Sequence, residues 1–545
     1  MYKKIALLDI FPDYAEIVES TGLGSLAAVM QENGYSTLLR AYNYSKIDYA
    51  SISAFIPDVI GLPVNYDTIE IIKEITSKLK CDYPGALFFS GGYLPTNAPD
   101  EIFEALGDID AIIRGEGEYT LLEMLEVLNS QKDLNQVKGL SYRDGTNIVH
   151  NGDRQLIENL DKLPFPDRSV RNQYSIPMIQ VEGARGCPCS CSFCSLHAFW
   201  NCNYSQKAGD WRAKSPARVV DEIELAAKRY GIFRFRFLDS SFENPSFNKE
   251  RMAEVAKEIL KRDINISYFV NFRASVHKIL DDDLMNLLID SGLTGVFLGL
   301  ESFAENDIKI FNKSASERDG YKALDFLQQY PIYLNIGMIN FHPDSTLEGL
   351  KKNALMLQKY RLATRLLFIR ELMVFKGTPI FDRLLSEGAL HGSVIRIDSY
   401  DFKDERVEKI VLFFRQLRKK CKYIDILEGY STSYPHLLND LKNVFRKKTD
   451  HAADRAIDIF ESRLNYILDT FGEVFSEFTL ELIKIAENGW CEEEAWRIRE
   501  VYISDEYLGQ VVSQLELNSL LLQRNMIKLN RDYSAFFYNN PVGKF

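Results

Sequence analysis

The sequence predicts an α/β protein with three parts: an N-terminal doubly wound, Rossmann-like parallel sheet, a central partial (β/α)6 barrel of the TIM type, and a helical C-terminal domain. Short β-branched runs alternate with amphipathic helical patterns up to about residue 128, and the alternation resumes between about residues 176 and 390. Beyond about residue 401 only helical patterns follow. Alternation of this kind predicts parallel strands covered by helices.

Four strands are expected in the first stretch, each followed by a helix. The strands are residues 4–10, 58–64, 86–92 and 111–116, and the helices are expected at 24–33 and after Asp67, Pro99 and Tyr119. Glycines stand at two strand ends, as Gly91 and Gly92 and as Gly115 and Gly117. Because open α/β sheets bind ligands at the carboxyl ends of their strands, we expect a binding site there.

A hairpin and a linker follow. Residues 137–152 alternate around Asp144 and Gly145, which predicts a β-hairpin. Residues 161–170 carry two prolines and few periodic apolar positions. We therefore expect a first domain at 1–140, the hairpin and linker at 141–175, the barrel at 176–395 and the helical domain at 396–545. Several domains are also what a chain of 545 residues requires.

The barrel is expected to have six strand–helix units. Its candidate strands are residues 178–184, 233–239, 267–273, 295–302, 333–341 and 366–375. Chemistry in such barrels is found at the carboxyl ends of the strands. In the helical domain, one apolar stripe is predicted at Ile457, Phe460, Leu464, Ile467, Leu468 and Phe471.

Charge and hydropathy exclude some classes of partner. The formal net charge of −12 argues against nucleic-acid binding, which generally needs a basic face. The first apolar run ends at Asp9, so it reads as a buried strand rather than a signal sequence. No run reaches the roughly 18 apolar residues of a membrane span. We expect a cytoplasmic protein without a membrane span.

Four of the eight cysteines lie close together, as Cys187, Cys189, Cys191 and Cys194. Thiolates at such spacing bind zinc or an iron–sulfur cluster. A zinc site would use Cys189 as its fourth ligand, but structural zinc sites usually pair two such knuckles and no second one is present. An iron–sulfur cluster is therefore favoured over zinc.

The pattern C-x-x-x-C-x-x-C, with Phe193 before the last cysteine, resembles the radical S-adenosylmethionine superfamily. The resemblance implies a 4Fe-4S cluster on three cysteines, with Cys189 not a ligand. It also implies that S-adenosylmethionine chelates the open iron beside Phe193. One electron, from a donor such as flavodoxin or ferredoxin, then gives a 5′-deoxyadenosyl radical.

Further residues match the same group in order. Asp239, Arg273 and Glu301 end the second, third and fourth expected barrel strands. The resemblance implies that they face the active site, with Glu301 beside S-adenosylmethionine; the alternative is that each merely caps a helix or forms an ion pair. The segments HPDSTLEG and FKGTPIFDRLLSEG also resemble the group, with Lys376 in place of the usual proline.

The N-terminal domain resembles the cobalamin-binding domain that precedes many radical enzymes. The residues that the resemblance assigns to the cofactor are Gly22, Gly24, Ser90, Gly91, Gly92, Tyr93, Gly115, Glu116, Gly117 and Glu118. The alternative is that the glycines serve only tight turns. No D-x-H-x-x-G motif is present, so we expect no histidine from this domain on cobalt.

These features together predict a cobalamin-dependent radical enzyme. The leading hypothesis is a methyltransferase that acts, through methylcobalamin, on an unactivated carbon or a phosphinate phosphorus of a natural-product, peptide or lipid-like substrate. The same cofactors could instead serve cyclisation, ring contraction or oxidation without methyl transfer. An alternative of another class is a non-catalytic corrinoid-binding sensor.

Overall fold

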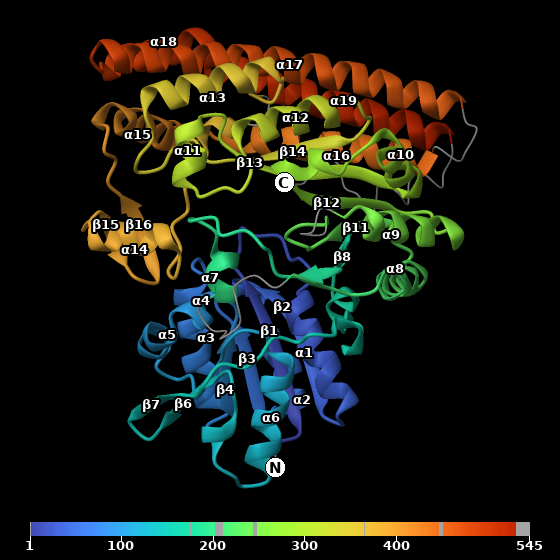
Figure 1. The fold of residues 1–545 in the computed structure, drawn as a ribbon, viewed down its shortest axis with the longest axis vertical. Coiled ribbons are helices and arrows are strands. Elements are labelled where there is room, and N and C mark those ends of the chain that lie inside the picture. The colour runs from blue at the N-terminus through green and yellow to red at the C-terminus, as the bar shows by residue number, and fades with distance from the viewer. Residues whose placement is uncertain are drawn as a thin grey trace. The chain divides into compact units, whose positions relative to one another are not determined.

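The structure, a computed structural model, describes residues 2–174, 176–201, 211–243, 248–363, 366–445 and 451–529 (Figure 1). The chain forms two compact units. Unit 1 comprises Met1–Ala226, Leu238–Ser240 and Val374–Ser399. Unit 2 comprises Ala227–Phe237, Ser241–Met373 and Tyr400–Phe545.

Unit 1 is built on a seven-stranded sheet with the order β2-β1-β3-β4-β5-β6-β7. Its strands are β1 (Lys4–Phe11), β2 (Ser36–Asn43), β3 (Val59–Pro63), β4 (Leu87–Gly91), β5 (Ala111–Ile113), β6 (Leu140–Asp144) and β7 (Asn147–His150). The first five strands are parallel, which confirms the predicted doubly wound sheet. The chain order reverses between β1 and β3, where such sheets bind ligands.

The hairpin β6–β7 pairs antiparallel onto β5 and so completes this sheet. The expected hairpin is confirmed, but the domain boundary placed after residue 140 separates β6 from the sheet to which it belongs. The reason is that the edge of β5 offers unpaired backbone groups, and Ala111, Ile112 and Ile113 pair with the hairpin.

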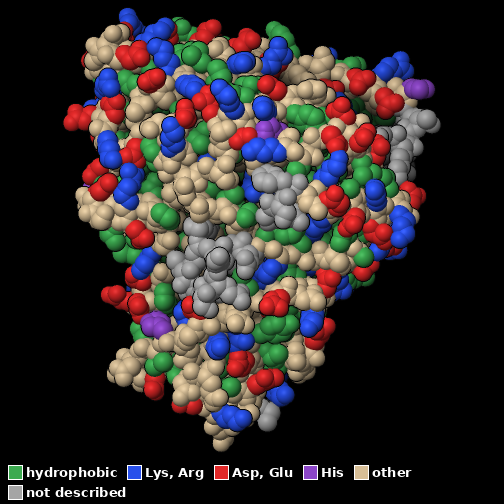
Figure 2. All heavy atoms as spheres, viewed as in Figure 1, with side chains coloured by type: hydrophobic (Ala, Val, Ile, Leu, Met, Phe, Trp, Pro, Cys, Tyr) green, Lys and Arg blue, Asp and Glu red, His purple; other side chains and the backbone are tan. Residues whose placement is uncertain are grey.

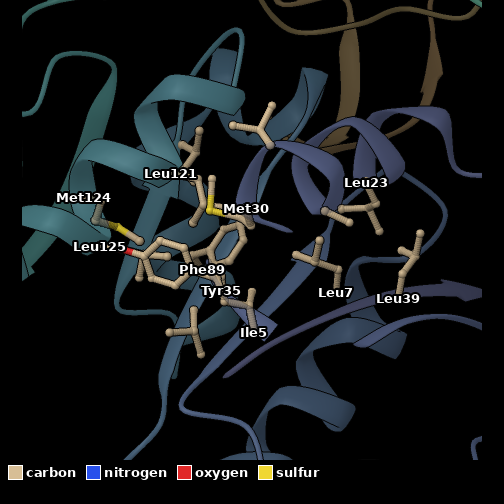
Figure 3. Packing of buried hydrophobic residues seen from close by; sticks show 14 of the residues in the cluster. Ile5, Leu7, Leu23, Met30, Tyr35, Leu39, Phe89, Leu121, Met124 and Leu125 are labelled. Carbon is tan, nitrogen blue, oxygen red and sulfur yellow. The ribbon is translucent and has the colours of Figure 1, made fainter. Parts of the chain in front are cut away.

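Side chains alternate between the two faces of the sheet and form two cores. Ile5 and Leu7 of β1 pack with α1 (Thr21–Glu32) and α6 (Glu118–Asn129), as Figure 3 shows for ten labelled residues. Ala6 and Leu8 point to the other face, against α2 (Tyr49–Phe55), α3 (Ile69–Asp82), α4 (Tyr93–Asn97) and α5 (Pro99–Leu106). This period of two is that of a sheet buried on both faces.

The remaining elements of unit 1 are short. They are η1 (Tyr44–Lys46), η2 (Leu134–Gln136), η3 (Leu160–Lys162), η4 (Ser169–Asn172), β8 (Ile179–Val181), β9 (Ala184–Arg185), α7 (Ser195–Asn201), β10 (Arg212–Ala213), α14 (Pro379–Ser386), β15 (Leu390–Ser393) and β16 (Arg396–Tyr400). Helix α8 (Pro216–Tyr230) begins in this unit.

Unit 2 contains the strands β14-β13-β12-β11 in that order, all parallel. They are β11 (Arg234–Phe237), β12 (Ser267–Arg273), β13 (Leu293–Glu301) and β14 (Tyr333–Met338). Around them lie α9 (Glu250–Lys261), η5 (Ala274–Lys278), α10 (Asp282–Ser291), α11 (Glu305–Ile310), α12 (Glu317–Leu327) and α13 (Leu347–Lys359).

The sixth strand expected at residues 366–375 is wrong. The segment forms η7 (Leu367–Ile369), and only Glu371 makes an isolated bridge, to Phe341. Leu366 has a positive φ of 52°, and this left-handed backbone interrupts an extended run. An apolar run of this length does not distinguish a strand from a buried turn.

The segments HPDSTLEG and FKGTPIFDRLLSEG begin helices. The Thr346 hydroxyl accepts a hydrogen bond from the Gly349 N–H at the start of α13, at 3.1 Å. The Thr378 hydroxyl accepts one from the Phe381 N–H at the start of α14, at 3.3 Å, and Pro379 follows in the first turn. Threonine caps and proline at the first helical position stabilise helix starts. These residues therefore have an architectural role.

The C-terminal part of unit 2 is helical. It consists of α15 (Glu405–Lys420), α16 (Tyr423–Phe445), α17 (His451–Asn488), α18 (Glu492–Ile503) and α19 (Asp505–Leu529). The predicted apolar stripe on α17 is buried throughout. Within the described ranges, no helix has both the length and the apolar character to cross a bilayer. On the face that Figure 2 shows, basic and acidic side chains are interspersed.

Candidate active site

A cavity of about 290 Å³ opens at the carboxyl ends of the parallel strands of unit 1. Its walls come from the ends of β3, β4 and β5, from the first turn of α1 and from residues on both sides of the cysteine motif. The lining residues are Ser20, Gly22, Leu23, Leu26, Leu62, Pro63, Phe89, Gly91, Gly92, Tyr93, Ile113, Gly115, Glu116, Gly117, Glu118, Glu182, Arg185 and Phe199. The cavity therefore lies where the sheet predicts a ligand.

Five glycines, Gly22, Gly91, Gly92, Gly115 and Gly117, contribute backbone to this wall. Gly92 has a φ of +106°, which residues with a Cβ rarely adopt. A Cβ on Gly22 would meet no atom within 4 Å, so this position opens into free space. A large planar ligand could therefore approach the backbone closely, as cobalamin would need to do. No histidine belongs to the lining among the residues that the structure describes.

Two of the residues expected to contact the cofactor make packing contacts in this structure, and their cofactor role stays a prediction. A Cβ on Gly24 would lie 2.5 Å from the Asp167 carbonyl oxygen, so this glycine lets α1 pack against the linker. Ser90 is fully buried, and its hydroxyl donates to the Leu62 carbonyl at 2.9 Å, which joins β4 to β3. Neither residue lines the cavity.

Tyr93 and Phe199 form an aromatic wall. Tyr93 is the first residue of α4, and Phe199 lies in α7, directly after the cysteine motif. The ring centroids are 4.7 Å apart and the planes are inclined by 65°, the edge-to-face arrangement that aromatic pairs prefer. Tyr93 was expected from the sequence to contact the cofactor, whereas no role was expected for Phe199.

A network of charges connects the loop after β5 to the start of the cysteine motif. The Arg185 guanidinium donates to the carboxylates of Glu116 at 2.9 Å and Glu118 at 2.7 Å. Its Nε donates to Glu182 at 2.9 Å. All three contacts hold a residue that lies two positions before Cys187. The loop after β5 and the start of the cysteine motif are thereby fixed to each other within unit 1.

Further hydrogen-bond donors contact the carboxylates of Glu116 and Glu118. Arg212 Nη1 contacts both oxygens of Glu116 at 3.0 Å, and the Ser25 hydroxyl donates to Glu118 at 2.7 Å. Burial raises the pKa of the Glu118 carboxyl, but the charge of Arg185 and these hydrogen bonds outweigh it and leave the pKa below its ordinary value. Glu118 is therefore an anion near neutral pH.

The cysteine motif lies between β9 and α7. Cys187, Cys191 and Cys194 are partly buried, and the Cys194 N–H donates to the Cys191 carbonyl at 3.2 Å. The sulfurs do not converge into a group of three metal ligands in the described part of the chain, and the thiols of Cys187 and Cys189 contact each other. The ligand set, with Phe193 beside it, stays a prediction.

Asp239 is fully buried in unit 1. Its Oδ1 accepts a hydrogen bond from the Gly183 N–H at 2.6 Å, and the neighbouring Leu238 N–H donates to Val181 at 2.9 Å. These contacts fix the backbone that leads from β8 to the cysteines. The geometry supports a positioning role for Asp239, while a catalytic role stays a prediction.

Glu301, in unit 2, has an unusual backbone and a basic partner. Its φ is +75°, and the β13–β14 register shifts between Gly299 and Glu301. Lys313 Nζ lies 3.3 Å from Glu301 Oε1 and 3.1 Å from the Gly299 carbonyl oxygen. A Cβ on Gly337 would lie 2.9 Å from Glu301 Oε2, so the glycine leaves room for this carboxylate. Strained backbone of this kind is typical of functional sites.

Arg273 ends β12 and pairs with Glu243. The Arg273 N–H and Nε donate to Glu243 Oε1 at 2.9 and 2.8 Å. Glu243 is fully buried, and burial raises the pKa of its carboxyl despite the charge of Arg273. Glu243 was not expected from the sequence.

Lys376, which departs from the resembled motif, contacts α5 within unit 1. Its Nζ pairs with Glu101, and its N–H donates to the Tyr66 hydroxyl at 2.9 Å. Lys376, in place of the proline of the resembled motif, therefore adds an ion pair with α5. Its N–H, which proline lacks, also makes a hydrogen bond.

Five charged residues of these sites were not expected from the sequence: Glu182, Arg185, Arg212, Glu243 and Lys313. A signal existed for Glu182 and Arg185, which lie in EGARGC directly before the cysteine loop. The other three lie outside any motif, and only the folded chain brings them to their partners.

Comparison with known families agrees with this architecture. The B12 binding domain profile matches residues 11–125, and the Radical SAM superfamily profile matches residues 181–354. These families bind cobalamin, and S-adenosylmethionine with a 4Fe-4S cluster, so these cofactors are assigned to the chain. The first region contains the glycine-lined cavity wall, and the second contains the cysteines and β11–β14.

Several known proteins are similar to the chain. An uncharacterised methyltransferase of Pyrococcus horikoshii is 26% identical over 339 residues, which cover 60% of this chain and 70% of that protein. The anaerobic magnesium-protoporphyrin IX monomethyl ester cyclase of Cereibacter sphaeroides is 29% identical over 56% of this chain and 49% of its own length, so the match spans about half of that enzyme.

The cobalamin-dependent S-adenosylmethionine radical enzyme OxsB, solved with aqua-cobalamin and S-adenosylmethionine, has a similar fold. Its TM-score is 0.66 at 18% identity, and the alignment covers 100% of this chain and 82% of that one.

The cavity can be tested by filling it. We predict that Gly22→Leu weakens hydroxocobalamin retention by roughly fivefold to more than a hundredfold, because overpacking costs about 1 to 3 kcal/mol. A Cβ at this position meets no atom of the protein within 4 Å, so the fold should be kept. The measurement is the corrin absorption that remains with the protein after gel filtration. Gly85→Leu is the control, since Gly85 is equally open but lies outside the cavity; equal retention by both variants would refute the site.

The ligand set can be tested by single cysteine changes. We predict that Cys187→Ala, Cys191→Ala and Cys194→Ala each lose the cluster and the cleavage of S-adenosylmethionine, whereas Cys189→Ala retains about four irons per chain after anaerobic reconstitution. Iron analysis and 5′-deoxyadenosine formation are the readouts. A Cys189→Ala protein without iron, beside a Cys187→Ala protein that keeps it, would exchange the roles of these two residues.

Proposed function

We propose that this chain, a radical S-adenosylmethionine enzyme with an N-terminal cobalamin-binding domain, is a methyltransferase. Its target is an unactivated carbon, or a phosphinate phosphorus, of a natural-product, peptide or lipid-like substrate. The observation that carries the proposal is the cavity of unit 1, whose lining joins the glycine-rich strand ends to Glu182, Arg185 and Phe199 beside the cysteine motif. A cofactor in that cavity would lie against the segment that holds the cluster.

The cofactors supply the chemistry that side chains lack. A 5′-deoxyadenosyl radical can remove hydrogen from a carbon that no side-chain base could deprotonate near neutral pH, and methylcobalamin can supply the methyl group. The role of the protein is to hold the cofactors and exclude water. Gly22, Gly91 and Gly92 would admit the corrin, while Arg185 would fix the cysteine loop beside it.

Glu301 is the residue that we assign to S-adenosylmethionine, through its amino or ribose groups. Lys313 holds one carboxylate oxygen, and Gly337 leaves space around the other. A carboxylate fixed in this way is prepared to accept charge-assisted hydrogen bonds. The electron needed for cleavage would come from a flavodoxin or a ferredoxin.

The relatives support methyl transfer but also name a different outcome. The Pyrococcus horikoshii protein is named a methyltransferase, whereas the Cereibacter sphaeroides protein is named a cyclase. Cyclisation, ring contraction or oxidation therefore remains the second candidate. A non-catalytic corrinoid-binding sensor is the candidate of another class, and cleavage of S-adenosylmethionine by the reconstituted protein would exclude it.

Product mass separates the candidates. We predict that cells with the intact gene accumulate a compound heavier by one CH₂ group than the compound that accumulates when the gene is deleted, because a methyl group replaces a hydrogen. Comparative mass spectrometry of both extracts is the measurement, and cells with the Cys187→Ala gene are the control. A product that differs by the loss of hydrogen, or by oxygen, would instead support the second candidate.

A further inference from the structure

The carboxylate of Glu243 is an unexplained feature of unit 2. The residue is fully buried, and Arg273 donates twice to its Oε1, from the main chain and from Nε. Its Oε2 is buried and has no hydrogen-bond partner among the residues that the structure describes. A buried oxygen without a donor is costly, and native proteins keep few of them. Among the described residues, no donor satisfies this oxygen, so a ligand could supply one.

The surroundings of Glu243 are rigid and at the end of the sheet where ligands bind. The Phe242 N–H donates to the Asn271 carbonyl at 2.9 Å, which fixes the segment alongside the end of β12. The Phe242 ring packs against Phe237 with centroids 4.8 Å apart and against Phe272 at 6.4 Å. The carboxylate is thus held in place by aromatic packing and by Arg273. Ligands of parallel β/α folds bind at these strand ends.

We propose that Glu243 Oε2 accepts a hydrogen bond from a hydroxyl, amine or amide N–H of the substrate. The proposal rests on the proposed function and narrows its substrate class. A substrate that meets Glu243 is polar at this contact, whereas a hydrocarbon would leave the oxygen unsatisfied. Arg273 is a positioning residue that holds the carboxylate through Oε1.

S-adenosylmethionine is the other possible source of such a donor. It is assigned to Glu301, which ends β13 on the far side of β12 from the Glu243 segment. Two strand spacings separate these positions by about 10 Å. Each carboxylate also has its own basic partner, Lys313 for Glu301 and Arg273 for Glu243. Two separately held carboxylates suit two different ligands. We therefore take the substrate as the ligand of Glu243, and binding of S-adenosylmethionine to a Glu243 variant distinguishes the two sources.

The test is the Glu243→Gln substitution in the full-length chain. Glutamine keeps the size and one acceptor toward Arg273, but it replaces the unpartnered oxygen with an NH₂ donor that opposes a donor on the ligand. We expect the product that distinguishes wild-type cells from the deletion strain to fall by about ten- to hundredfold, the effect of losing a charged hydrogen bond. Product at the wild-type level would overturn the proposal.

Binding of S-adenosylmethionine to the purified, reconstituted variant identifies the source of the donor. Affinity within roughly threefold of wild type supports the substrate, and a loss of about tenfold or more overturns it in favour of S-adenosylmethionine. Glu243→Asp keeps the charge, so it should form more product than Glu243→Gln. A Glu243→Asp variant that forms less product than Glu243→Gln would count against the proposal. Iron content and cobalamin retention report folding, and Glu254→Gln on the exposed face of α9 is the matched control. If wild-type cells show no product at all, the proposed function fails instead.

Discussion

The arrangement of unit 1 depends on one guanidinium, that of Arg185. Its side chain is 9% exposed and contacts three carboxylates, Glu182, Glu116 and Glu118, at 2.7 to 2.9 Å. Removing one partner of such a buried network leaves an uncompensated charge and typically costs about 3 to 5 kcal/mol. Burial lowers the pKa of Arg185, but the three carboxylates raise it well above its usual value. The network therefore holds the loop after β5 and the approach to Cys187 in one geometry.

In unit 2, carboxylates are likewise held by basic side chains, but each has one basic partner. Glu301 is held by Lys313 and Glu243 by Arg273, and each acid lies at or next to the end of a parallel strand. In both pairs the basic residue occupies one oxygen of the carboxylate. A carboxylate fixed on one side by the protein retains the capacity to accept donors on the other, and its orientation is set before a ligand arrives.

Patterns with a short period could be predicted from the sequence, and contacts between distant segments could not. The alternation of strand and helix patterns predicted the parallel sheet covered by helices on both faces, and the stripe from Ile457 to Phe471 predicted a helix within α17. Residues 366–375 misled because an apolar run fits a strand and a buried turn equally well. For Gly24 and Ser90 the sequence could not distinguish a residue that faces a ligand from one that packs against a neighbouring segment, since a small residue suits both. Glu243 and Lys313 belong to no motif, since their roles arise from partners 30 and 12 residues away.

The central claim is that cobalamin carries the methyl group to the substrate. A methyl carrier needs a methyl source, and we propose that S-adenosylmethionine, the other cofactor assigned to the chain, is also that source. It can be tested without knowing the substrate. The protein, reconstituted with its cluster and hydroxocobalamin and then reduced, is given S-adenosylmethionine with a deuterated methyl group, and the bound corrinoid is extracted for mass spectrometry. The account predicts methylcobalamin that carries the label. A corrinoid that stays unlabelled while 5′-deoxyadenosine accumulates would contradict it.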